Sequence, residues 1–206
     1  MRTITSVILL LVSATLVAQT NDPAATETRS WNFGGEANFY FIKDNFFVNP
    51  IITADHEWLH LETRYNYEDF QTTSFFVGYN FSVEKKINVD FTPMIGIAGG
   101  NTKGVVPGIE LTVSFGKWEF YTETEWLYSP EDKANNFFYS WSELTYAPSE
   151  LIYFGISGQR TRLYQTTTEI EKGFLLGFTF GKVFLAGYVF NPFDKPFLLL
   201  SAGIDL

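Results

Sequence analysis

Residues Leu59–Glu68 read Leu-His-Leu-Glu-Thr-Arg-Tyr-Asn-Tyr-Glu, and two kinds of side chain alternate through all ten positions. One set is Leu59, Leu61, Thr63, Tyr65 and Tyr67, and the other is His60, Glu62, Arg64, Asn66 and Glu68. Successive side chains of a β-strand point to opposite faces, whereas a helix would scatter both sets around its circumference. The segment therefore predicts a strand with one mostly apolar face and one charged face.

The same alternation recurs along most of the chain. It is clear in Phe33–Phe41, Phe75–Phe81, Ile87–Ile97, Ile109–Phe115, Trp118–Trp126, Phe174–Phe180 and Leu198–Leu206. It is weaker in Phe46–Ala54, Phe137–Tyr146, Leu151–Leu163 and Val183–Phe190. We therefore predict an all-β chain of twelve strands, with ten as the alternative count, and no helix.

Composition excludes several classes of protein. The 206 residues are 46% hydrophobic and 18% aromatic, which is too apolar for a disordered chain. The absence of cysteine excludes a disulfide framework and a thiolate metal site. A net charge of −9 with only 14 Lys and Arg residues argues against a nucleic acid partner, because binding phosphates requires a basic surface.

The N-terminal residues have the features of a secretory signal peptide. Arg2 precedes the apolar run Val7–Val12, and small residues follow as far as Ala18. We expect a signal peptide over residues 1–18, a flexible lead-in over residues 19–30 and one domain over residues 31–206.

The connections between the predicted strands differ in length on the two sides of the sheet. Tight connections follow the even strands, at Asp55–Glu57, Glu84–Lys86, Gly116–Lys117, Ala147–Glu150 and Gly181–Lys182. Longer connections follow most odd strands, at Glu68–Thr72, Gly99–Gly104, Ser129–Asn136, Gln165–Lys172 and Asn191–Pro196, with the short Lys43–Asn45 as the exception. Short turns at one rim and longer loops at the other are typical of a transmembrane β-barrel.

Aromatic residues fall at the strand ends, where such barrels carry interfacial girdles. We expect one girdle of Trp31, Trp58, Phe115, Trp118 and Phe184, and another of Phe41, Phe46, Tyr67, Trp126, Tyr128 and Phe190. The alternative is a soluble barrel or sandwich of eight to ten strands with the apolar face inside, in which two girdles would have no use. We therefore predict a single antiparallel transmembrane β-barrel.

The last strand continues to the end of the chain, with Leu198, Leu200, Ala202, Ile204 and Leu206 on one face. This segment resembles the C-terminal insertion signal of Gram-negative outer-membrane barrels, although it ends in leucine where that signal has an aromatic residue. The resemblance is to small outer-membrane β-barrel proteins with a porin-like architecture. It implies a location in the cell outer membrane, with outer-membrane lipid around the barrel.

Two prolines fall inside predicted strands. Pro50 and Pro93 cannot donate a ladder hydrogen bond, and a closed barrel offers no edge strand to hold them. We expect a bulge or an interrupted strand at each.

If the apolar face meets lipid, the other face lines the lumen and is strongly acidic. By alternation it carries Glu36, His60, Glu62, Arg64, Glu68, Asp90, Glu110, Glu119, Glu123, Glu125 and Glu143. Arg160 and Arg162 continue the apolar face of their strand, unless a bulge at Gly158 turns them inward.

Three of these acids are expected to form a row. The two-residue turn Gly116–Lys117 aligns its flanking strands so that Glu110 lies opposite Glu123. Glu143 would then be the next neighbour of Glu123 if Tyr128 pairs with Phe138.

This acidic row has two interpretations. Rings of carboxylates select cations in pores, which predicts a small passive channel for cations or other small solutes. Alternatively, Arg64 and the tyrosines cross-link the acids and close the lumen, which predicts a closed structural barrel. Neither interpretation requires a cofactor, and neither settles the oligomeric state.

One motif indicates a different function. His56-Glu57-Trp58-Leu59-His60 matches H-E-x-x-H, in which two histidines bind zinc and the glutamate is the general base of a hydrolase. That chemistry needs a helix, because on a continuous strand His56 and His60 would lie about 13 Å apart. A zinc-dependent hydrolase is therefore the weaker alternative, and we expect no enzyme and no metal ligands.

Overall fold

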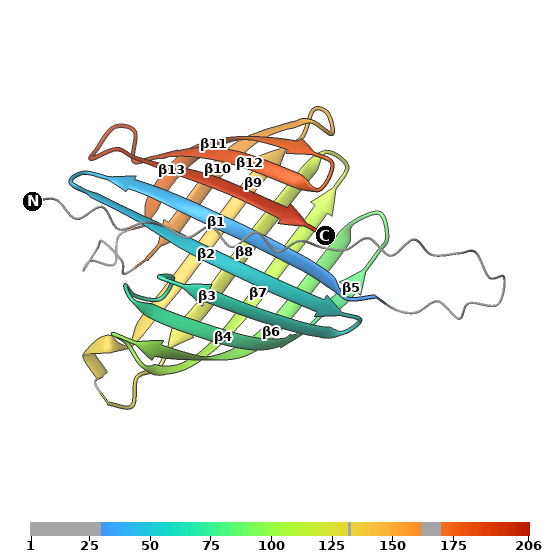
Figure 1. Cartoon of the computed structure of the whole chain (residues 1–206). Helices are drawn as coiled ribbons and strands as arrows, with labels where there is room; N and C mark the ends of the chain where they lie inside the picture. Colours follow the sequence, from blue (N-terminus) through green and yellow to red (C-terminus); the bar gives the residue numbers. More distant parts are fainter. Residues whose placement is uncertain (1–29, 132, 162–169) are drawn as a thin grey trace, which may run out of the picture.

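Strand pairing continues around the whole molecule and closes where the first strand, β1, pairs with the last, β13. The computed structural model describes residues 30–131, 133–161 and 170–206. Its elements are β1 Asn32–Ile42, β2 Asn45–His56, β3 Leu59–Tyr65, β4 Thr72–Tyr79, β5 Phe81–Val83, β6 Asn88–Gly100, β7 Gly104–Phe115, β8 Trp118–Leu127, the 3₁₀ turn η1 Lys133–Asn135, β9 Phe137–Tyr146, β10 Ile152–Arg160, β11 Glu171–Phe180, β12 Val183–Phe190 and β13 Phe197–Asp205. All pairs are antiparallel, and the strands run obliquely around one barrel (Figure 1).

The barrel has twelve strands, because β4 and β5 are two parts of one. Both pair with β6 in the same register, as Gly78 opposite Met94 and Phe81 opposite Phe91 show. The predicted all-β, twelve-stranded barrel is therefore confirmed.

Most strands present a row of exposed apolar side chains on their outer face, as expected for strands that meet lipid. On β4, Phe75 and Val77 are 47% and 42% exposed, whereas the inward Thr72 and Ser74 are 0% and 1% exposed. A soluble barrel would show the reverse pattern. In the parts of the chain that the structure describes, no helix is both long and apolar enough to span a membrane.

The connections define two rims. We call the end with tight turns the short-turn rim, where Gly116 and Gly181 adopt positive φ angles of 61° and 62° that suit two-residue hairpins. The amide N–H of Leu206 donates to the carbonyl of Phe33, so the end of β13 and the start of β1 meet at this rim. The opposite end, which we call the long-loop rim, carries most of the longer connections.

Neither proline produces a bulge, which corrects our expectation in part. β2 and β6 run through Pro50 and Pro93 in continuous register with β1 and β7. The gap between β4 and β5 lies on the other side of β6, opposite Pro93, because the missing N–H leaves the ladder open there. The interruption therefore occurs in the strand beside the proline.

Three residues that we expected in the aromatic girdles lie inside the barrel instead. Phe190 is 0% exposed and Tyr67 6% exposed, and Phe184 lines the lumen. Phe184 and Phe190 share the inward face of β12 with Tyr188, so alternation itself would have placed them correctly. The other proposed girdle residues are exposed on the exterior, namely Trp31, Trp58, Phe115, Trp118, Phe41, Phe46, Trp126 and Tyr128.

Arg160 lies on the outward face of β10 without a bulge. Its guanidinium donates to the carbonyl of Phe138 and lies 4.8 Å from the ring of Phe137. Arg162, the signal peptide over residues 1–18 and all but the last residue of the lead-in over residues 19–30 lie outside the described residues.

Candidate functional site

Arg64 on β3 is the centre of a buried polar cluster in the lumen. Alternation on β3 turns its side chain inward, where it is 1% exposed. Its guanidinium donates short hydrogen bonds to Glu62 and Glu123, and a longer one of 3.3 Å to Glu125. The rings of Tyr67 and Phe76 lie 4.3 and 4.6 Å from its central carbon. Arg64 therefore links β3 to residues on distant strands across the interior.

Four carboxylates surround this single guanidinium. Glu110 is the fourth, with Oε1 3.5 Å from Nη2 of Arg64. The tight turn at Gly116–Lys117 aligns β7 with β8 so that Glu110 lies opposite Glu123. If all four acids were ionised, the cluster would carry three more negative than positive charges. Such an excess is stable in a buried site only when protons or a cation neutralise it.

The third member of the expected acidic row lies elsewhere. β8 pairs with β9 in a register that places Trp141 opposite Glu123, and Glu143 opposite Tyr121. This register is two residues away from the one that we assumed. The prediction of a row of three carboxylates is therefore wrong, although Glu110 and Glu123 are direct neighbours as expected.

The β3–β4 connection folds into the lumen beside Arg64. Asn66 adopts a positive φ of 58°, which ends the alternation of β3 and turns Tyr67 inward. The Tyr67 hydroxyl donates to Oε2 of Glu123 at 2.8 Å and forms a second hydrogen bond of 2.6 Å with the hydroxyl of Tyr139. Phe70 packs edge-on against Phe47 at a ring-centroid distance of 5.0 Å. The connection therefore reaches both the acidic cluster and β2.

Glu68 in this connection is a buried carboxylic acid whose burial is only partly compensated. Its side chain is 6% exposed, and neither carboxylate oxygen has a hydrogen-bond partner among the described residues. Burial raises the pKa of the Glu68 carboxyl, and the positive charge of Arg64 offsets only part of this effect. A raised pKa means that the folded protein favours the protonated form.

An apolar wall lines the lumen across from the acidic cluster. Its buried members are Tyr40, Phe47, Leu175, Ala186, Tyr188, Phe190, Phe197 and Leu199, from β1, β2 and β11–β13. Trp141 contacts the wall edge-on, with ring centroids 5.6 Å from Phe190. Because Phe190 and Leu199 are 0% exposed, the interior towards the long-loop rim is filled by side chains.

A cavity of about 840 Å³ occupies the other half of the lumen. We call it the vestibule. Gly116, Lys117 and Asp205 lie at its short-turn end, and Tyr40, Tyr67 and Tyr139 lie at its inner end. Acidic and aromatic side chains make up much of its wall, including Glu36, Glu119, Tyr121, Trp141, Glu143, Tyr153 and Tyr188. The vestibule therefore ends at the layer of Arg64 and the tyrosines.

The remaining predicted lumen residues occupy two environments. Glu36 accepts hydrogen bonds from Asn38 and Ser201, at 2.7 and 2.9 Å, and Glu143 accepts one from the Trp141 indole at 2.8 Å. Asp90 and Glu119 are exposed near the short-turn rim, where their partners are Ser82 and Ser114.

The H-E-x-x-H segment forms a hairpin and cannot bind zinc as a hydrolase does. His56 ends β2, Glu57 has a positive φ of 56° in the turn, and His60 lies in β3. His56 and His60 point to opposite faces of the sheet. His56 packs outside at 5.0 Å from Trp31, whereas Nδ1 of His60 lies inside, 2.8 Å from Oδ1 of Asp55.

Several further residues shape the lumen without having been predicted to do so from the sequence. Tyr139 and Trp141 have the same parity as Glu143, so alternation would have placed them on the inner face. The inward fold of Tyr67 gave no such signal, because it depends on the backbone conformation of Asn66.

An apolar exterior around an acidic, partly filled lumen defines a transmembrane β-barrel. Two solved structures share this fold at low sequence identity. The KdgM porin in complex with disordered oligogalacturonate superimposes with a TM-score of 0.59 at 9% identity, covering 84% of this chain and 98% of that one. The NanC porin gives a TM-score of 0.52 at 10% identity, with the same coverage. No family model matches the sequence, and no curated protein does.

Proposed function

We propose that this protein is a small passive outer-membrane channel that favours cations, with the layer of Arg64, Tyr67 and Tyr139 as its constriction. The observation that carries the proposal is the charge of the inner face. Arg64 is the one buried Lys or Arg among the described residues, whereas Glu62, Glu68, Glu123, Glu125 and Glu171 are all buried acids. Carboxylates at close quarters attract cations and repel anions.

The vestibule also indicates which solutes would enter. Its wall combines Glu36, Glu119 and Glu143 with tyrosine and tryptophan rings. Aromatic faces and carboxylates together attract small organic cations. Oligogalacturonate, which is bound in one KdgM structure, carries a carboxylate on each sugar and would be repelled here. We therefore expect this barrel to share the fold of that porin without sharing its solute.

Selectivity measurements test the proposal. The refolded protein is placed in a planar bilayer with a potassium chloride gradient. The sign of its reversal potential should show that potassium permeates more readily than chloride. Replacing both Glu110 and Glu123 with Gln should move this potential towards zero, because two charges at the constriction are lost. Glu119→Gln with Glu143→Gln provides a second pair that does not contact Arg64.

The matched control is Glu84→Gln with Glu131→Gln, which removes the same charge from exposed connections. It should leave the reversal potential nearly unchanged. An anion-selective current, or equal effects of the control and lumen pairs, would contradict the proposal.

The filled half of the lumen favours a second candidate, a closed structural barrel. In that case Arg64 and the tyrosines seal the interior permanently. A bilayer that stays silent for the intact protein and for variants of the constriction would support this candidate.

A further inference from the structure

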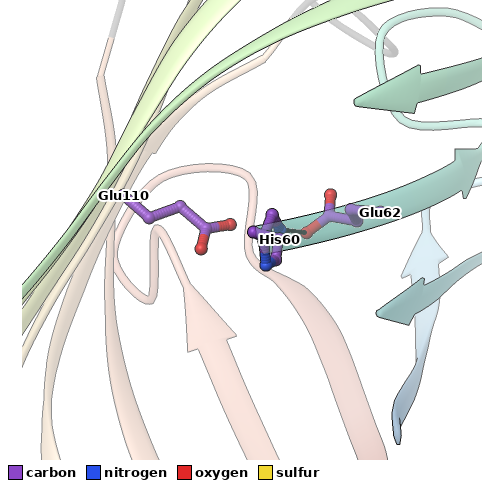
Figure 2. Close-up of side chains that lie close together, drawn as sticks. All are labelled: His60, Glu62 and Glu110. Atoms are coloured by element: carbon purple, nitrogen blue, oxygen red, sulfur yellow. Dashed lines mark ion pairs between the residues drawn. The ribbon is translucent and has the colours of Figure 1, made fainter. Parts of the chain in front are cut away.

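Three potential metal ligands converge in the lumen beside Arg64. They are His60 and Glu62 on β3 and Glu110 on β7, each of which offers one donor atom within 4.8 Å of the other two. Figure 2 shows the Glu110 carboxylate reaching towards the His60 ring from the facing wall, with Glu62 on the other side of the ring.

His60 gives an independent indication that a ligand belongs there. Its side chain is 6% exposed, and its Nε2 atom has no hydrogen-bond partner within the described chain. The nearest Glu62 oxygen, Oε2, lies 3.6 Å away, which is too far for a hydrogen bond. A buried polar atom without a partner costs about 1–3 kcal/mol, so an occupant would stabilise the site.

The other nitrogen of the ring is already held in place. Nδ1 of His60 lies 2.8 Å from Oδ1 of Asp55, and Asp55 also accepts a 2.7 Å hydrogen bond from Asn80. A carboxylate on one imidazole nitrogen is the usual support of a histidine whose other nitrogen binds metal. The ring is therefore oriented with Nε2 towards the two glutamates.

The charge of the surroundings favours a cation. Arg64 takes one oxygen of Glu62, which leaves Oε2 directed at His60. Glu110 lies 3.5 Å from Arg64 and is 21% exposed, so its carboxylate has room to turn. A cation at this position would reduce the excess of buried carboxylates over positive charges.

We propose that His60 Nε2, Glu62 and Glu110 bind one divalent transition-metal ion, a site that does not depend on the channel function. One imidazole with two carboxylates suits Zn²⁺ and similar ions better than Ca²⁺ or Mg²⁺. Donors around tetrahedral zinc lie about 3.4 Å apart, so a small rotation of Glu110 completes the triad. A neighbouring cavity of about 200 Å³, lined by Glu62 and Glu110, provides room for a water as fourth ligand.

Titration of the metal-free protein tests the site. The full chain, refolded in detergent without a histidine tag and stripped with EDTA, should bind one Zn²⁺ per chain by calorimetry. Co²⁺ should give the visible absorption of a four- or five-coordinate ion. His60→Gln should weaken Zn²⁺ binding at least about 100-fold, and Asp55→Asn about 10–100-fold, the range for residues that support a ligand.

The sequence contains two histidines, so His56→Gln is the matched control. It removes an imidazole from the outer face and should leave Zn²⁺ affinity unchanged. Heat-modifiable mobility on a detergent gel would verify that each variant is folded. Glu110→Gln, which alters a partly exposed residue, replaces His60→Gln if that variant does not refold.

No stoichiometric Zn²⁺ binding by the intact chain would overturn the proposal. So would equal affinities in folded His60→Gln and His56→Gln variants. Because binding is measured in detergent, a silent bilayer would count against the channel function and leave the metal site intact.

Discussion

The two halves of the lumen are built differently. Towards the long-loop rim, Arg64, Tyr67 and the apolar wall fill the interior, and side chains such as Phe190 are fully buried. Towards the short-turn rim, acids and aromatic rings surround an open vestibule of about 840 Å³. The same twelve strands form both halves, so the difference arises from the size and pairing of inward side chains and from one inward connection. The barrel therefore sets only the width, and the side chains determine how much of it stays open.

This contrast assigns different tasks to the halves. Glu119 in the vestibule remains exposed, so its carboxylate can attract cations without the cost of burial. Acids in the filled half need partners, and Arg64 contacts four of them. The stability of the filled half should consequently depend on one residue.

The largest effect is expected from Arg64→Met. The variant leaves Glu62, Glu123 and Glu125 buried without their cation, a situation that costs about 3–5 kcal/mol. Urea unfolding in detergent, followed by tryptophan fluorescence at neutral pH, should show this loss. Arg160→Met removes an outward arginine as the control. If both variants lose an equally small amount of unfolding free energy, the stability of the filled half does not depend on Arg64.

The next effect concerns the constriction itself. Tyr67→Ala removes the phenol whose hydroxyl is hydrogen-bonded to Glu123 and Tyr139. Its loss should join the vestibule to the long-loop rim and raise the single-channel conductance several-fold. Tyr65→Ala is the matched control, because Tyr65 lies two residues away and is 41% exposed on the lipid face. A conductance that is equal in the two variants would place the constriction elsewhere.

The comparison of the halves also explains what the sequence could predict. Alternation identified the strands because each face meets a different medium, and Leu59–Tyr65 follows it without exception. The pairing of Glu110 with Glu123 was predictable because a two-residue turn allows one alignment. The position of Glu143 was not, because the long connection between β8 and β9 does not determine their register.

The sequence alone did not predict that side chains fill half of the lumen. The apolar wall consists of side chains such as Leu175 and Leu199, which look the same in sequence whether they face lipid or a packed interior. Alternation assigns a side chain to a face, but it does not show how far inward side chains from distant strands reach. The contacts of Arg64 and the convergence of His60 with Glu110 became visible only with the barrel closed.

The smallest effect is expected from Glu68→Gln, which concerns the connection that closes the filled half. The ordinary pKa of this carboxyl, 4.5, is raised in the folded protein, so folding favours the protonated form. Its contribution to stability is therefore fully present below pH 4.5 and is lost as the pH rises through the folded pKa. The variant is always neutral and should therefore exceed the wild type in unfolding free energy at pH 7, where burial of the ionised carboxylate costs the wild type stability.

The difference between the two proteins should disappear near pH 4, where Glu68 is protonated in both states. Urea unfolding at the two pH values measures it, and Glu131→Gln, which alters a carboxylate 70% exposed, is the control. A stability gain of the same size at both pH values would show that burial of charge is not its cause. A loss at pH 7 would mean that ionised Glu68 stabilises the connection through Arg64, and the filled half would then hold one more acid that needs this cation.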